Sequence, residues 1–265
     1  MPKLSIITPT YNSASTLLAT LDSLTSLLNR CAEHIVVDSG SDDNTVEIAK
    51  HFGSKVIYHP PGNIYDAINA GLAIATGDWL TYINSDDILF ADYVVEALDS
   101  SLHSADLIYG DIDYIDSVGR FLFSRRAAST NHLPWLMHFY NPFPQQGTLV
   151  KKSVFAKIGY FNSEYRYAAD YDFFVRCILN GMHFEKFHKK SVAAFRLNPS
   201  QLSQKERHHM APEGVRIRYL LNNSTRSYLR ILLRGLSILY RWITNLDSIF
   251  LRFMRGRRQD SAWRN

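Results

Sequence analysis

Two adjacent carboxylates and an amide follow a short apolar run in the first third of the chain, in Asn84-Ser85-Asp86-Asp87. Neighbouring like charges repel each other and resist burial, so this segment is unfavourable for packing alone. A hard divalent cation removes that cost, because Mg²⁺ and Mn²⁺ prefer oxygen ligands and pair with phosphates. In an extended segment Asn84 and Asp86 point the same way and Asp87 points the opposite way. The alternative is a solvated turn that caps the following helix.

The elements that must position this cluster alternate between strand and helix patterns. Apolar and β-branched runs predict strands at 4–8, where Pro9 ends the run, and at 34–38, 55–58 and 79–83. Helical spacing predicts helices at 15–28, about 42–51, 65–75 and 91–102. This order implies an α/β fold with a mixed, mostly parallel sheet and helices on both faces. Ligands of such sheets bind beyond the carboxyl ends of the strands, and polar residues concentrate at those ends here, in Thr8-Pro9-Thr10, Asp38-Ser39 and Asn84-Ser85-Asp86.

Residues 106–200 have a mixed pattern that should complete the sheet. Strand-like runs cover 107–114, 121–124, 147–150 and 191–196, and helices are expected around Phe155 and at 169–179. We expect one domain over residues 1–205, made of halves 1–105 and 106–205, followed by a helical tail over 206–265.

Four segments form an ordered series: 5–12 (SIITPTYN), 36–45 (VVDSGSDDNT), 65–78 (YDAINAGLAIATGD) and 84–87 (NSDD), with a fifth motif near residue 170. Together they resemble the family-2 inverting glycosyltransferases, which have the Rossmann-like GT-A fold. The resemblance is closest to bacterial members that build O-antigen, capsule or exopolysaccharide, and it fades beyond roughly residue 205. It implies hexosyl transfer from a nucleotide-sugar, with a UDP-sugar favoured, to a glycan or lipid-linked acceptor. It also assigns residues 106–205 to the acceptor and catalytic-base half.

The resemblance implies that the nucleotide lies at the ends of the first two strands. Thr8, Pro9 and Tyr11 would line the base pocket. Asp38 would accept a hydrogen bond from a base N–H, a role that suits a carboxylate because it only accepts. A plain strand-end turn is the alternative for Asp38.

Further donor contacts follow from the same resemblance. Asp66 and Asn69 are the polar candidates on the expected helix at 65–75, where many relatives carry an arginine in place of Ile68; both could instead be surface residues. Gln146 is a candidate sugar contact, with a loop amide as the alternative. Arg196 matches a late segment near the diphosphate, which a guanidinium fork suits.

The metal motif of the family is usually Asp-x-Asp, and Asn84 stands at its first position here. We therefore expect Asp86 to be the principal ligand of Mg²⁺ or Mn²⁺. Asn84 would contact ribose or metal-bound water, and Ser85 would contact the nucleotide-sugar. The cation would neutralise the departing diphosphate as a Lewis acid.

The fifth motif, at residues 168–176 (AADYDFFVR), resembles the base motif of the family. Inverting transfer is a single displacement, and a carboxylate within hydrogen-bond reach takes the proton of the acceptor hydroxyl. Aligned this way, Asp170 is the base and Asp172 a second acid. The helix N-terminus would lower the pKa of the carboxyl and keep it ionised. Both acids could instead only cap that helix.

The charge of the chain is unevenly distributed. Residues 216–265 hold eleven arginines and two aspartates, a net charge of +9, so the remainder carries −5. From Arg226 onward polar residues recur with the helical period, and nearly all residues between them are apolar. Such a helix can lie in an anionic lipid surface. It could also pack on its own domain or form a dimer interface, and its bulky apolar residues argue against nucleic acid.

Composition narrows the remaining choices. Cys31 and Cys177 have no disulfide or metal-site spacing and are expected to be buried. No secretion signal and no membrane span are expected, which favours a cytoplasmic enzyme at the inner face of the cell membrane. A homo-oligomer is compatible with the sequence. An inactive nucleotide-sugar-binding partner subunit is the main rival, but Asp38, Asp86 and Asp170 are all present. A nucleotidyltransferase would need a glycine-rich first loop, which is absent.

Overall fold

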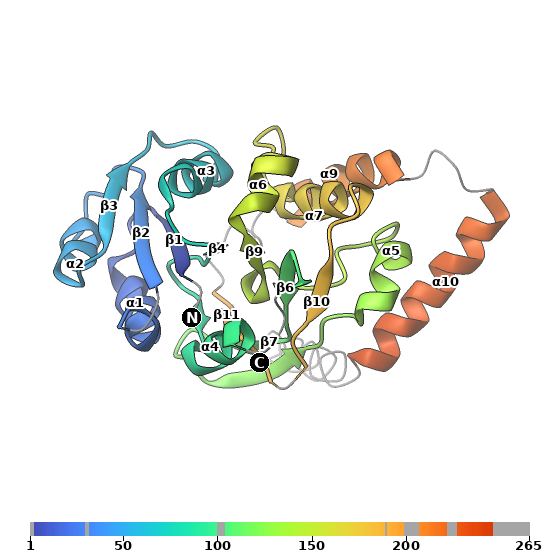
Figure 1. The fold of residues 1–265 in the computed structure, drawn as a ribbon, viewed down its shortest axis with the longest axis horizontal. Helices are drawn as coiled ribbons and strands as arrows, with labels where there is room; N and C mark the ends of the chain where they lie inside the picture. Colours follow the sequence, from blue (N-terminus) through green and yellow to red (C-terminus); the bar gives the residue numbers. More distant parts are fainter. Residues whose placement is uncertain are drawn as a thin grey trace, which may run out of the picture.

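The computed structural model describes residues 3–29, 32–99, 104–188, 190–198, 207–221 and 227–245 (Figure 1). The strands are β1 (Leu4–Thr10), β2 (Ala32–Asp38), β3 (Lys55–Tyr58), β4 (Trp79–Tyr82), β5 (Ile88–Leu89), β6 (Leu107–Tyr109), β7 (Ile112–Ile115), β8 (Phe121–Arg125), β9 (Leu149–Lys151), β10 (Phe184–Lys186) and β11 (Ala193–Arg196). The helices are α1 (Ala14–Leu28), α2 (Thr45–His51), α3 (Ile64–Ile74), α4 (Ala91–Asp99), α5 (Leu133–Leu136), α6 (Lys152–Ile158), α7 (Ala169–Leu179), α9 (Arg207–Leu221) and α10 (Ser227–Thr244), with 3₁₀ turns η2 (Thr130–His132) and η3 (Gln145–Gly147).

The central sheet has the strand order β10-β6-β9-β4-β1-β2-β3. Strands β4, β1, β2 and β3 run parallel, as do β10 and β6, whereas β9 is antiparallel to both of its neighbours. The sheet is therefore mixed and mostly parallel, which confirms the predicted fold class.

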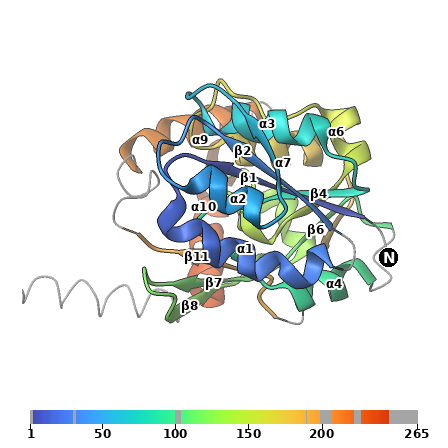
Figure 2. The ribbon, with the colours of Figure 1, turned by 90° about the vertical axis from the view of Figure 1, so that its left-hand side faces the viewer.

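Helices cover both faces of this sheet (Figure 2). Side chains alternate along β1, so Leu4 and Ile6 pack with α1 and α4, while Ile7 packs with α3 in the core that also holds α6 and α7. Gly71 of α3 sits so close to β1 that an added Cβ would lie 2.6 Å from Ile7 Cγ2. Glycine at this position lets α3 approach the sheet.

Strand β1 continues through Pro9, where we expected it to end. The carbonyl of Ile7 accepts a hydrogen bond from the N–H of Ile83, so the backbone polar groups of Ile7 point toward β4. Backbone polar groups of alternate residues point toward the same neighbouring strand, so the nitrogen of Pro9 also points toward β4. The pairing with β4 stops at Ile7. The missing N–H of Pro9 therefore falls where no strand partner would use it.

A second sheet, in the order β5-β11-β7-β8, lies beside the central one. We expected a single strand over 107–114, and this prediction is wrong. The chain leaves the central sheet after Tyr109 and enters the small sheet at Ile112. Gly110 makes this change of direction at a point where a Cβ would lie 3.0 Å from Val192. Strands β5 and β10 were not predicted, since they are too short to show a periodicity.

The C-terminal part contains two helices among the described residues. Ile217 and Leu221 of α9 are buried in the same core as α7. Helix α10 packs along α5 and η2, where Tyr240 contacts the rings of His132 and Trp135. Residues 246–265 of the expected tail, and Cys31, lie outside the described residues, while Cys177 is buried as predicted. No helix within the described ranges is both long and apolar enough to cross a membrane.

Candidate active site

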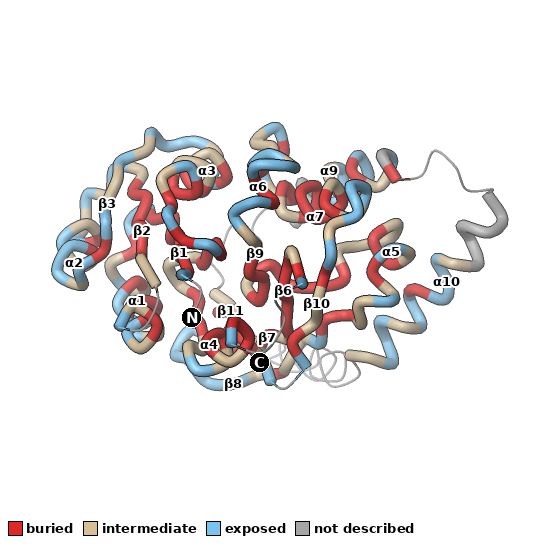
Figure 3. Tube along the Cα trace, viewed as in Figure 1, coloured by how far each residue is buried: buried red, intermediate tan, exposed pale blue. Residues whose placement is uncertain are grey.

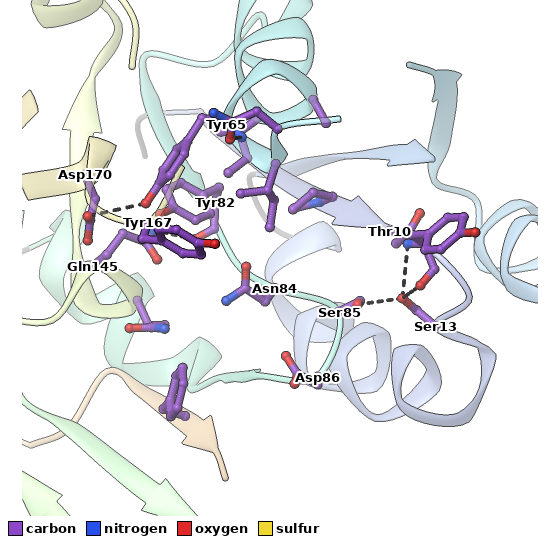
Figure 4. A pocket seen from close by; sticks show the side chains of 18 of the residues that line it. Thr10, Ser13, Tyr65, Tyr82, Asn84, Ser85, Asp86, Gln145, Tyr167 and Asp170 are labelled. Carbon is purple, nitrogen blue, oxygen red and sulfur yellow. Dashed lines mark hydrogen bonds between the residues drawn. The ribbon is translucent and has the colours of Figure 1, made fainter. Parts of the chain in front are cut away.

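One cleft of about 880 Å³ opens at the carboxyl ends of β1 and β4. Its walls come from the start of α1, the start of α3, the segment 84–86, the segment 141–146, the small sheet and the start of α7. Figure 4 shows Thr10 and Ser13 on one side, Asn84, Ser85 and Asp86 along the floor, and Asp170 on the opposite side. The volume is in the range of small-molecule sites.

The end of β1 forms one wall of the cleft. Pro9, Thr10 and Tyr11 line it together with Ser39, which follows β2. The ring of Tyr11 is 61% exposed, so it offers a flat surface to a ligand. Pro9 and Tyr11 therefore lie where we expected nucleotide contacts, whereas Thr10 was not among the predicted residues.

Thr8 does not reach the cleft. Its side chain points into the interior, where Oγ1 lies 2.9 Å from Nε2 of His34. His34 also contacts Ser54, and burial lowers the pKa of His34 to about 4, so the ring stays neutral. The expected base contact of Thr8 is corrected to a structural one, because alternate residues of β1 face opposite sides of the sheet.

Asp38 lies behind the cleft wall rather than in it. Its carboxylate accepts hydrogen bonds from the backbone of Gly40 and Ser41 and from the hydroxyls of Ser41 and Thr10. Burial alone would raise the pKa of Asp38, but these bonds together hold it below its usual value. In this structure Asp38 supports Thr10 and the 38–41 turn, and its expected contact with the base stays a prediction.

Asp66 and Asn69, the candidates on α3, also lie outside the cleft lining. Asp66 is in the first turn of α3, where a negative charge favours the helix N-terminus. The amide of Asn69 donates to the carbonyl of Phe161 at 2.8 Å and accepts from its N–H at 3.1 Å. Asn69 therefore joins α3 to the segment after α6. The neighbouring residue that faces the cleft is Tyr65, which sequence reasoning passed over.

The acidic segment after β4 divides as its alternation predicted. Asn84, Ser85 and Asp86 line the cleft, and Ser85 donates to the hydroxyl of Ser13 at 2.8 Å. Asp87 points away and is fully buried. Its Oδ2 accepts from Asn84 Nδ2 at 3.2 Å and from Gln146 Nε2 at 3.3 Å. Burial, and then the adjacent Asp86 carboxylate, raise the pKa of Asp87 well above its usual value.

Arg196 holds this segment in place rather than facing the cleft. Its backbone N–H donates to Asp87 Oδ1 at 3.0 Å, and its Nε donates to the carbonyl of Asp86 at 2.8 Å. A further bond reaches the carbonyl of Ser117 at 3.2 Å. The side chain is buried, so the expected diphosphate contact is corrected to a contact with the backbone of the acidic segment.

Asp170 lies at the start of α7 and lines the cleft opposite Thr10. Its Oδ1 accepts from the N–H of Tyr171 at 2.8 Å and from the hydroxyl of Tyr65 at 3.4 Å. We expected the helix N-terminus to lower the pKa of Asp170. Instead, burial raises it to about 6, because desolvation outweighs the hydrogen bonds. A carboxyl with this pKa is mostly ionised at neutral pH and can accept a proton.

Asp172 faces the protein interior. Its Oδ2 lies 2.8 Å from Nε of Arg176, one turn later on α7, and the carboxylate is buried. Arg176 also donates to the carbonyls of Ile158 and Tyr160. The expected role as a second acid at the cleft is therefore corrected to an ion pair that fixes α7 against the end of α6.

The segment 141–146 forms the far wall. Gln145 is buried and donates to the carbonyl of Tyr82 at 2.8 Å, which ties η3 to β4. Gln146, the predicted sugar contact, lines the cleft beside Asp87. Other cleft residues were not predicted from the sequence, since each comes from a segment without a recognised motif: Asn63, Tyr114, Arg125, Asn141, Arg166, Tyr167 and Phe195.

The donor set at the cleft fits one kind of metal binding. Across the part of the chain that the structure describes, no group of three or more His, Cys, Asp or Glu side chains could hold a metal ion. The acidic segment contributes one carboxylate, Asp86, to the cleft. A single carboxylate suits a cation that keeps several waters and takes its other oxygen ligands from a substrate diphosphate. Such a cation would bind together with a nucleotide ligand.

Comparisons with known proteins identify a family and several relatives. The family model described as Glycosyl transferase family 2 matches residues 5–164. A "PGL/p-HBAD biosynthesis glycosyltransferase" of Mycobacterium tuberculosis is 34% identical over 203 residues, which are 73% of this chain and 77% of that protein. An uncharacterized glycosyltransferase of Rickettsia prowazekii is 27% identical over 64% of this chain and 57% of its own.

Solved structures are similar in fold at low sequence identity. S. aureus TarS superposes with a TM-score of 0.63 at 21% identity, over 91% of this chain and 43% of that chain. The 1-349 form of TarS in complex with UDP-GlcNAc superposes with a TM-score of 0.62 at 19% sequence identity, over 91% of this chain and 72% of that chain. Glucosyl-3-phosphoglycerate synthase from Mycobacterium tuberculosis was solved in complex with Mn²⁺, UDP and phosphoglyceric acid. It superposes with a TM-score of 0.59 at 19% sequence identity, over 85% of this chain and 80% of that chain.

Proposed function

The chain belongs to glycosyl transferase family 2 and is a glycosyltransferase, and on that premise we propose a metal-dependent, inverting transfer from a UDP-sugar to a glycan or lipid-linked acceptor in bacterial surface polysaccharide synthesis. The observation that carries this proposal is the shared cleft of Asp86 and Asp170. Had these side chains opened onto separate surfaces, single-displacement chemistry between them would have been excluded.

The donor nucleotide would bind against Pro9, Thr10 and Tyr11, with its diphosphate toward Ser85 and Asp86. Solved relatives by fold bind UDP and UDP-GlcNAc, which favours a uridine nucleotide here. A divalent cation held by Asp86 would stabilise the charge on the departing diphosphate as a Lewis acid. The Mn²⁺ in one structural relative supports this requirement.

The acceptor hydroxyl would approach from the side of Asp170 (Figure 4). Asp170 takes the hydroxyl proton at its carboxylate as the new carbon–oxygen bond forms and the bond to the diphosphate breaks. Attack from the face opposite the leaving group inverts the anomeric carbon. The long contact from Tyr65 to Asp170 orients the carboxylate without removing its basicity.

Helix α10 supports the proposal that the acceptor is reached at a membrane. Its inward side carries Ser237, which is buried, and Tyr240, whose hydroxyl accepts from the N–H of Ser129. Several of its large apolar side chains are exposed, and Figure 3 colours much of the described part of α10 as exposed. They are Leu236, Ile238, Leu239, Trp242 and Ile243.

We propose that an anionic lipid surface covers this apolar face. The arginines of residues 216–265 complement anionic headgroups, and the exposed apolar face can enter the headgroup layer. The far end of α10 adjoins the acceptor side, because Asn245 accepts from the N–H of Arg126. The enzyme would then act at the inner face of the cell membrane.

Binding and turnover measurements test the proposed function. A panel of nucleotide-sugars is screened for Mn²⁺-dependent thermal stabilisation, and the best donor is then offered with a membrane extract as acceptor. One UDP-sugar should stabilise the protein and be consumed, while Asp170→Asn should still bind it but transfer about 10²–10⁴-fold more slowly. Binding without any turnover by the wild type would favour the inactive partner subunit instead.

A further inference from the structure

The small sheet carries a row of three aromatic rings, two of which line the cleft. Phe195 of β11 pairs with Tyr114 of β7, and Tyr114 pairs with Phe123 of β8, so the three side chains stand side by side on one face. The ring centroids are 5.3 Å apart for the first pair and 4.5 Å apart for the second. Tyr114 and Phe195 are half-buried and line the cleft. Such rings offer a flat apolar platform with a polar tip.

Arg125 extends the same row. It follows Phe123 by two residues on β8, so its side chain starts from the same face of the sheet, and it lines the cleft. Its guanidinium donates to the carbonyl of Asn141 at 2.9 Å. Among the described residues, Arg125 has no carboxylate within ion-pair distance. Its positive charge acts on Asp170 from a distance, but its guanidinium makes no direct bond to that carboxylate and retains donors for a ligand oxyanion.

Most charged residues of the cleft lie on one of its two sides. Its charged residues are Asp86 on the floor and Asp170, Arg166 and Arg125 on the side away from β1. Asn141, which holds Arg125, also has a buried side-chain Oδ1 that meets no donor within the described part of the chain. This side therefore carries cationic donors for an anion and, at Asn141, an unused acceptor that suits a ligand hydroxyl.

Two ligands could use these groups, the donor diphosphate or the acceptor. The donor contacts proposed above lie on the other side of the cleft, at Thr10 and Ser85. Arg125 lies next to α10 instead, because the backbone N–H of Arg126 donates to Asn245. This placement favours the acceptor.

We propose that Arg125, with the Tyr114–Phe195 platform, forms an acceptor subsite for a ring that carries an oxyanion, either a carboxylate or a phosphate. The proposal rests on the proposed function and deepens it by naming the acceptor class. The ring lies against Tyr114 and Phe195, the oxyanion pairs with Arg125, and the reacting hydroxyl points to Asp170. A neutral ring would use the platform but leave Arg125 without its partner.

Binding of three probes to the full chain tests the subsite. Phenyl β-D-glucopyranoside, phenyl β-D-glucuronide and phenyl phosphate are titrated by NMR in the presence of UDP and Mg²⁺, which unlike Mn²⁺ is diamagnetic and leaves the probe signals sharp. The two anionic probes should bind at least about tenfold more tightly than the neutral one, and Arg125→Gln should remove that difference. Arg126→Gln is the matched control, because Arg126 is exposed and outside the cleft lining.

UDP affinity is measured in the same samples, so the two proposals fail separately. A wild type that binds UDP but shows no anion preference overturns the subsite alone. A loss of UDP affinity in Arg125→Gln, with the anion preference intact, reassigns Arg125 to the donor diphosphate. Absence of UDP binding with a preserved anion preference refutes the donor site and leaves the anion subsite standing.

Discussion

The pKa of Asp170 leads to a specific pH dependence of transfer. The base works only when ionised, and burial raises its pKa to about 6 from the ordinary 3.8. The ionised fraction is then about 0.97 at pH 7.5 and about 0.1 at pH 5, so kcat/KM should fall about tenfold between these values. An aspartate with the ordinary pKa would lose only about 6% over the same interval.

The groups that face Asp170 do not titrate in this window. Tyr65 of α3 and Tyr82 of β4 have pKa values raised well above 10 by burial, so both stay neutral. A raised pKa also means that the folded state binds the Asp170 proton more tightly than the unfolded state does. Acidification through pH 6 therefore stabilises the fold at this residue, and the loss of activity is not an unfolding effect.

The assay is a pH profile of kcat/KM by nucleotide release, with donor affinity and circular dichroism followed in parallel. Tyr65→Phe removes a hydrogen bond to the ionised form, so its acidic limb should move up by a few tenths of a pH unit. The residual activity of Asp170→Asn should show no such limb, which separates Asp170 from Asp87. A wild-type profile that stays flat down to pH 5 while the protein remains folded would refute the reasoning.

Further predictions concern binding, packing and membrane contact. Asp86→Ala should abolish the Mn²⁺-dependent part of donor affinity in calorimetry; equal affinities with and without Mn²⁺ in the wild type would contradict this. Asp172→Asn removes the charge of a buried carboxylate whose Arg176 partner is partly exposed, and it should cost about 1–3 kcal/mol of stability in urea unfolding while the folded fraction keeps its activity. Gly71→Ala should destabilise by about 1–3 kcal/mol, because its Cβ meets Ile7; an unchanged Tm would mean that α3 shifts freely. The double variant Leu239→Glu and Ile243→Glu should no longer float with phosphatidylglycerol vesicles. Flotation equal to that of the wild type would show that the apolar face of α10 does not bind the vesicles.

Local patterns predicted the elements that build the donor side. The strand at 55–58 matches the structure to the residue, and the other elements of the first hundred residues match within a few residues at their described ends. The helix at 169–179, on the side of Asp170, also matches to the residue. Periodicity works there because each element buries one side against a regular sheet. It failed at 107–114, where an apolar run spans two sheets and only the packing around Gly110 reveals the break.

Site residues were harder to predict because several polar side chains act on the protein itself. Arg196 and Asp172 carry the residue types of ligand contacts, but Arg196 bonds the distant carbonyl of Asp86 and Asp172 pairs with Arg176 one turn later on its own helix. The pKa of Asp170 likewise depends on burial by α3 and β4, which no local pattern reports. The cleft side at Tyr114 and Arg125 depends on strand register, which the sequence alone does not fix.

The position of β9 has a consequence for synthesis of the protein. Strand β4 pairs with β1 on one side, and its other edge is paired only with β9, some 70 residues further along the chain. At about 5–20 residues per second, a ribosome leaves that edge open for about 3–14 s. An open strand edge can pair with another nascent chain. Slow translation between residues 83 and 149 should therefore increase aggregation more than slow translation after residue 151.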